Sequence, residues 1–172
     1  MAEDFADRHV VRWRDHWIDI DFDEEIEAAT VRLMHIDRYL TRVTKAAAAK
    51  VGLQDYEYET LHRLMIRDTP GRASPGALAE SLGVSAAGMT GRIDSLERAG
   101  YVKRTPSETD RRRVDVEATQ AGVTVWRQAM ALRGEAEVAL ISRLTRRELA
   151  MFNRLLKKLA LFAESAAAGP AR

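Results

Sequence analysis

Hydrophobic residues recur every three or four positions along most of the chain, which is the period of an α-helix. Glycine, proline and clusters of polar residues interrupt the repeats and mark the ends of helices. A short stretch after residue 100 alternates instead, as β-strands do. The pattern predicts helices over residues 2–20, 24–51, 55–68, 75–82, 86–99, 120–144 and 146–165. We therefore expect a mainly α protein with a small β-wing.

Two of these helices are joined by a short turn whose residues are typical of helix ends. Ser74 and Pro75 fit the cap and the first position of a helix, and Gly83 fits its left-handed end. Ser85 caps the next helix, and Gly100 ends it. Two helices with so tight a connection predict a helix-turn-helix.

The second helix of this pair has one apolar face, and its first turns carry almost no side chain. Met89, Ile93 and Leu96 share the apolar face. Small side chains elsewhere allow a helix to lie deep in the major groove of DNA. The residues that we expect to contact DNA here are Ser85, Ala86, Ala87, Gly88, Thr90 and Gly91. The alternative is a surface of small residues that packs against another helix.

A two-stranded hairpin with a basic tip is predicted next. Its inner side is marked by Val102, Val114 and Val116. Alternation places Arg104 and Arg112 on that same side, and we expect Arg112 to pair with Asp110 and brace the tip. The outward residues expected to contact the DNA backbone are Lys103, Arg111 and Arg113. A basic hairpin beside a slim helix favours nucleic-acid binding over a solvated basic loop.

Several short motifs occur in the predicted helix-turn-helix and hairpin. They are Leu78-Ala79-Glu80-Ser81-Leu82, Val84-Ser85, Ile93-Asp94-Ser95-Leu96-Glu97-Arg98-Ala99-Gly100, Tyr101-Val102-Lys103-Arg104, Asp110-Arg111-Arg112, and Thr119 with Gly122. With them the chain resembles the MarR family of winged-helix transcription regulators over about residues 21–162. The chain departs from the family at Ala118, where leucine is usual. The resemblance implies an obligate homodimer on palindromic double-stranded DNA, often released by a small ligand.

The same resemblance divides the chain into regions. We expect an extra N-terminal helix over residues 1–20, a helical dimerisation region over 21–51 and 120–165, a winged helix-turn-helix domain over 53–119 and a disordered tail over 166–172. The apolar surfaces of the first long helix and of the last two exceed what one winged domain can cover. Burial against a second copy is the economical solution.

Composition narrows the function further. The 27 basic and 26 acidic residues leave a net charge of +1, so basic residues must act locally, at the wing. The absence of cysteine excludes disulfides and thiol-based sensing. We find no signal peptide and no long apolar run, and we expect a cytoplasmic protein with no membrane partner.

The sequence offers no enzyme constellation and predicts no cofactor or metal. The four histidines are His9, His16, His35 and His62. His62 and Glu59 share a helix face and could hold a metal ion, although a histidine satisfied by its neighbours is the favoured interpretation.

A ligand site is the remaining hypothesis about chemistry. Arg92 points partly into the body of the domain, and an inward Arg104 needs either an acid or an anionic guest. With Trp13, Trp17 and Glu59 they resemble the urate-responsive branch of the family, which has aspartate where Glu59 stands. The resemblance implies a tryptophan over a small anionic ligand such as urate or another aromatic acid. Alternatively, the arginines brace the fold and the tryptophans only dock their helix.

Three functions stay open at this stage. The first is a dimeric DNA-binding repressor that a small, anionic, aromatic ligand releases. The second is a winged-helix regulator without a ligand, controlled by its abundance or by a protein partner. The third is an enzyme, or a winged helix that binds protein instead of DNA.

Overall fold

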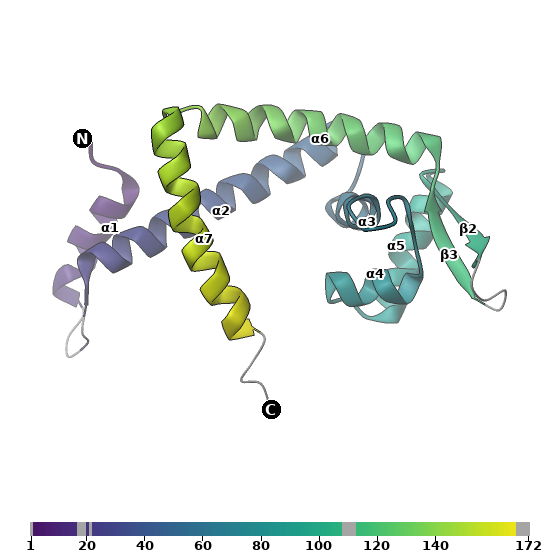
Figure 1. Cartoon of the computed structure of the whole chain (residues 1–172), viewed down its shortest axis with the longest axis horizontal. Helices are drawn as coiled ribbons and strands as arrows, with labels where there is room; N and C mark the ends of the chain where they lie inside the picture. Colours follow the sequence, from purple (N-terminus) through teal and green to yellow (C-terminus); the bar gives the residue numbers. More distant parts are fainter. Residues whose placement is uncertain (1, 17–19, 21, 108–112, 168–172) are drawn as a thin grey trace. The chain divides into compact units, whose positions relative to one another are not determined.

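The computed structural model describes residues 2–16, 20, 22–107 and 113–167, which fall into the compact units Met1–Arg133 and Gly134–Arg172. The elements are α1 (Phe5–Trp13), the 3₁₀ turn η1 (Arg14–His16), α2 (Glu24–Lys50), α3 (Asp55–Met65), β1 (Arg72–Ala73), α4 (Pro75–Leu82), α5 (Ala86–Arg98), β2 (Val102–Pro106), β3 (Val114–Ala118), α6 (Gln120–Ile141) and α7 (Arg146–Ala167) (Figure 1). The predicted fold class, mainly α with a small β-wing, is confirmed.

The helix ends around α4 and α5 follow from the residues that stand there. The Ser74 hydroxyl accepts a hydrogen bond from the Ala77 amide at 3.2 Å, with Pro75 in the first turn. Gly83 ends α4 with φ of 63°, a left-handed conformation that favours glycine. The Ser85 hydroxyl then accepts from the Gly88 amide at 3.1 Å and begins α5. The predicted helix-turn-helix is therefore confirmed at both ends of its turn.

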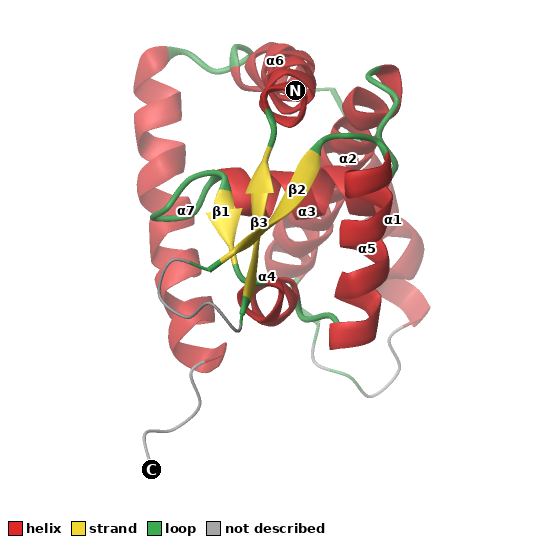
Figure 2. Cartoon of the chain, turned by 90° about the vertical axis from the view of Figure 1, so that its right-hand side faces the viewer, coloured by secondary structure: helices red, strands yellow, loops and turns green. Residues whose placement is uncertain are grey.

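The sheet has three strands, where the sequence predicted a two-stranded hairpin. Strand β3 lies between β1 and β2, and both pairings are antiparallel (Figure 2). The extra strand is only two residues long, and Ala73 pairs with Val116 across 43 positions of sequence. The Arg72 side chain donates to Asp115 and to the Pro106 carbonyl oxygen, at 3.2 and 3.1 Å. Strand β1 forms because it pairs with β3, which is distant in the sequence. It could not be predicted because two residues are too few to show an alternating pattern of hydrophobic and polar positions.

Helices α3, α4 and α5 enclose one core together with the sheet. Its most deeply buried large side chains are Leu61, Leu64, Leu78, Met89, Ile93, Leu96 and Val116. Val114, expected on the inner side, is 46% exposed, because it lies opposite Pro106 at the far end of the hairpin. The core therefore fixes the base of the wing, whereas Pro106 and Val114, farther along the hairpin, are exposed.

Helix α6 meets this core along a line of small residues. The buried positions are Gly122, Val125 and Ala129, whereas the larger residues Val123, Trp126 and Met130 are only partly buried. Small side chains allow α6 to approach closely, and the larger residues flank the contact.

The N-terminal helix is shorter than predicted. Helix α1 ends at Trp13, where a 3₁₀ turn begins, and Trp17 lies outside the described residues. The Arg32 side chain donates to Asp4 and Asp7, at 2.7 and 2.5 Å, and holds the pKa of Asp4 well below its usual range. Ion pairs between charged side chains thus attach α1 to the first half of α2.

The last helix begins at a polar cap and extends beyond its predicted end. The Glu148 carboxylate accepts from the Thr145 amide at 2.8 Å, and the Glu148 amide donates to the Thr145 hydroxyl, which together form a capping box. The Thr145 amide and the Thr145 hydroxyl both donate to the Glu148 carboxylate, and these two hydrogen bonds lower the pKa of Glu148. Helix α7 continues to Ala167, where the sequence predicted a disordered tail from residue 166. Among the described residues, no helix has the length and apolar character needed to cross a bilayer.

Candidate nucleic-acid interface

Helix α5 turns its large apolar residues inward and its small residues outward. Met89, Ile93 and Leu96 are at most 1% exposed. The open face of α5 is defined as Ser85, Ala86, Ala87, Gly88, Thr90 and Gly91, all of which are exposed. This is the set expected to contact DNA, and within the described chain it does not serve as a packing surface for another helix.

The open face is also narrow. A Cβ placed on Gly91 has no neighbour within 4 Å, and a Cβ on Gly88 meets only the Ser85 hydroxyl at 3.2 Å. The Thr90 hydroxyl donates to the Ala86 carbonyl oxygen at 3.0 Å, so its methyl group remains for an outside partner. A surface of methyl groups, hydroxyls and bare backbone fits a groove lined by thymine methyls and base edges.

The described part of the wing carries two exposed cations in the same domain. Lys103 is exposed and forms an ion pair with Glu117, its cross-strand neighbour, at 3.3 Å. Arg113 is exposed, and its carbonyl oxygen accepts from the Ser107 amide at 3.0 Å. The other predicted tip residues, Asp110, Arg111 and Arg112, lie outside the described residues. The expected pair between Asp110 and Arg112 therefore stays a prediction.

Arg104 faces α5, as alternation predicted. Its guanidinium binds Asp94 at 2.5 Å and also binds Glu97. The hydrogen bond with Asp94, with help from Glu97, raises the pKa of Arg104 above its usual value. The acid that an inward arginine needs is therefore supplied by α5 itself.

Arg92 leaves α5 on the other flank. It donates to Glu59 of α3 at 2.6 Å, and only 22% of its side chain is exposed. Two positions separate Arg92 from Asp94, so the two side chains leave the helix about 200° apart. The structure brings Glu59 and Arg92 together and places Arg104 on the opposite side of α5.

Trp13 lies at a different part of the molecule. It is 41% exposed on α1, and its ring contacts His9 and His16. Helix α1 binds α2 near Arg32, whereas Ala48 of α2 belongs to the core. Sixteen positions separate Arg32 from Ala48, about 24 Å along a helix. Within one chain, Trp13 therefore does not close over Arg92 or Arg104.

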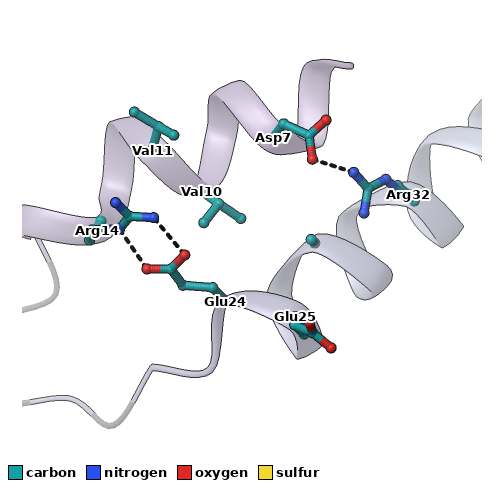
Figure 3. Close-up of a pocket in the computed structure, with 8 residues that line it drawn as sticks. Asp7, Val10, Val11, Arg14, Glu24, Glu25 and Arg32 are labelled. Carbon is teal, nitrogen blue, oxygen red and sulfur yellow. Dashed lines mark hydrogen bonds and ion pairs between the residues drawn. The ribbon is translucent and has the colours of Figure 1, made fainter. Parts of the chain in front are cut away.

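The seam between α1 and α2 contains a groove of about 520 Å³, shown in Figure 3. Val10 and Ala28 are among its lining residues, and an ion pair lies at each end. At one end the Arg14 guanidinium donates to the Glu24 carboxylate and lowers the pKa of Glu24. Four of the residues predicted to bind a ligand are described, namely Trp13, Glu59, Arg92 and Arg104, and none of these four lines this groove.

Two polar contacts that bear on the position of α5 and α6 were missed by the sequence analysis. Glu57 is 7% exposed and accepts from the Ser95 hydroxyl at 2.6 Å, which ties α3 to α5. His62, the candidate metal ligand, accepts from the Trp126 indole N–H at 3.1 Å. The position of Glu57, three residues after the cap of α3, could have indicated its capping role. Its second partner depends on tertiary packing.

Comparisons with known proteins agree with this geometry. Residues 51–113 match the family model described as MarR family. The transcriptional regulator PecS of Dickeya dadantii is 28% identical over 133 residues, which are 77% of this chain and 79% of PecS. The apo structure of E. coli MarR shares 26% identity and a TM-score of 0.63, over 74% of this chain and 93% of that one. A MepR variant from S. aureus, bound to an oligodeoxyribonucleotide, shares the fold at 17% identity and a TM-score of 0.59, over 83% and 99%.

Proposed function

Because the chain belongs to the MarR family of winged-helix, DNA-binding transcriptional regulators, we propose that it acts as a homodimeric repressor on a palindromic operator. The observation that carries the proposal is the open face of α5, which is narrow and exposed and belongs to the same domain as the cations of the wing. In this arrangement α5 enters the major groove, and the wing contacts the adjacent phosphates. Lys103, Arg111 and Arg113 supply the charge.

A homodimer is supported by apolar side chains that single-chain packing leaves exposed. On α2 they are Ile26, Leu33 and Met34, with exposures of 40 to 66%. On one face of α7 they are Met151, Leu155, Leu159 and Phe162, with exposures of 46 to 74%. Burying such surfaces against a second copy is favourable by about 25 cal/mol per Å². A two-fold axis then sets two α5 helices about one turn of DNA apart.

The dimer is tested by placing a charge within the apolar face of α7. We expect Leu159→Asp to convert a dimer into monomers, because an aspartate cannot be buried there without a partner. Lys157→Asp, on the polar side of the same helix, introduces the same residue and should remain dimeric. Sedimentation equilibrium gives the masses directly. Equal masses for both variants, or a monomeric unaltered protein, would remove the homodimer from the proposal.

Release by a small anionic ligand is the second part of the proposal. Arg92 and Arg104 hold the two flanks of α5, so an anion that drew either guanidinium away from its carboxylates would change how α5 is held. Urate and simple aromatic acids are the ligands to titrate against a preformed protein–DNA complex. We expect release by at least one of them, and Arg92→Gln should bind DNA but resist release. If no aromatic acid dissociates the complex, this part is wrong.

The same ion pairs favour a second candidate function, a regulator without a ligand. Each arginine already has a carboxylate partner, and the two lie on opposite flanks of α5. In that case the arginines hold α5 permanently, and the amount of protein or a protein partner controls transcription. The ligand titration separates the two, because this regulator keeps its operator at every ligand concentration.

A further inference from the structure

Arg104 connects β2 to α5 through its main chain as well as its side chain. Its backbone N–H donates to Oε1 of Glu97 at 3.0 Å. Its guanidinium donates to Oε2 of Glu97 and, with another nitrogen, to Oδ1 of Asp94 at 2.5 Å. One residue of the wing is thereby bound to two carboxylates of the helix.

The geometry of this contact fixes the distance between β2 and α5, in addition to balancing charge. Glu97 uses both oxygens on the same residue of β2, so it holds the strand at a set position. Asp94 and Glu97 are three positions apart and share a face of α5, which a planar guanidinium can bridge. A lysine, as a point charge, cannot reproduce this double contact.

The contact also lies close to where DNA is expected. Asp94 is partly exposed, on the side of α5 opposite Met89, Ile93 and Leu96. Without the Arg104 guanidinium, two carboxylates would stand beside the phosphates with no cation to balance their charge. The Arg104 side chain is 33% exposed, and its guanidinium is already bound to Asp94 and Glu97.

We propose that Arg104 is a positioning residue for DNA binding: it holds the wing at a fixed place relative to α5 by binding Asp94 and Glu97 together, and it contacts no phosphate or base. The role belongs to the ligand-free protein and so goes beyond the proposed release by an anion. It also rests on the DNA binding of the family, because the wing and α5 must reach the duplex together.

A double-mutant cycle tests this role. Arg104→Ala is measured in the unaltered chain and in a background that carries Asp94→Asn and Glu97→Gln. We expect about a tenfold loss of operator affinity in the unaltered chain, within the range found for contacting residues. In the background without the carboxylates, the same change should cost less than about twofold. Equal losses in both backgrounds would overturn the proposal, because Arg104 would then act without the two acids.

The dependence of affinity on salt supplies a second readout. Arg104→Ala should leave the slope of log K against log salt unchanged, whereas losing a phosphate contact reduces its magnitude by about 0.9. Lys103→Ala, at the neighbouring position of β2, is the matched control and should reduce the slope in both backgrounds. A reduced slope for Arg104→Ala would assign it to phosphate binding and contradict the proposal.

Folding and the wider function are controlled separately. Circular dichroism and thermal melting establish that each variant is folded before binding is measured. If Arg104→Ala does not fold, Arg104→Lys replaces it, with a smaller loss in the unaltered chain and none without the carboxylates. Failure of the proposed operator binding would appear as an unaltered protein that does not bind. Failure of this inference alone would appear as intact binding with equal losses in the two backgrounds.

Discussion

Gly122→Ala is expected to destabilise the protein by at least about 3 kcal/mol, at the upper end of the cost of overpacking. A Cβ on Gly122 would stand 2.0 Å from the Tyr101 carbonyl oxygen, and Gly122 lies in the first turn of α6. The obstacle is main chain that cannot rotate away, because that oxygen also accepts from the Thr119 amide at 3.0 Å. Either α6 or the start of β2 must therefore move.

Gly134→Ala is the control for this prediction, because it makes the same change in the same helix. A Cβ on Gly134 meets nothing within 4 Å, so the substitution should stabilise the protein by up to about 1 kcal/mol through helix propensity. Urea unfolding at one fixed protein concentration measures both variants. Similar midpoints for the two would mean that α6 does not pack against Tyr101 as described.

Gly91→Glu is expected to weaken operator binding by about 100-fold or more, equivalent to about 2.7 kcal/mol. Gly91 lies on the open face of α5 and has free space around it, so the fold should tolerate a longer side chain. In the groove the glutamate would meet the base edges sterically and the phosphates electrostatically. Fluorescence anisotropy with a labelled operator gives the affinity, and circular dichroism confirms the helix content.

A charge-matched control separates groove contact from net charge. Ala121 is exposed in the first turn of α6, away from the open face of α5. Ala121→Glu changes the net charge by the same amount and should weaken binding by less than about threefold, as a long-range charge effect. If both variants lost affinity equally, α5 would have no special place in the interface.

The parts of the fold that neighbouring residues determine could be predicted from the sequence. Ser74, Gly83 and Ser85 specify their helix ends through hydrogen bonds and backbone conformation within three positions. The buried face of α5 follows likewise from helical period alone. By contrast, β1 exists only through pairing with β3, and Val114 is exposed because the hairpin extends beyond the core.

The candidate site shows the same division. The open face of α5 and the inward side of Arg104 follow from local periodicity. Which partner each arginine meets does not, because Glu59 is 33 positions from Arg92 and the flank of α5 decides the choice. The sequence grouped Trp13 with both arginines, whereas α1 is attached to the far half of α2. The chemistry of these side chains suggested a single ligand-binding cluster. The structure instead places Trp13 on α1, Arg92 beside Glu59, and Arg104 on the opposite flank of α5.

In the proposed complex, two copies of α5 enter successive major grooves of one duplex while the wings contact the phosphates between and beside them. A hydroxyl-radical footprint on a bound promoter fragment measures this arrangement. We expect two protected tracts related by two-fold symmetry, with centres about 34 Å apart along the duplex axis. A single tract, or no protection at low salt where phosphate contacts are strongest, would show that the protein does not bind in this way.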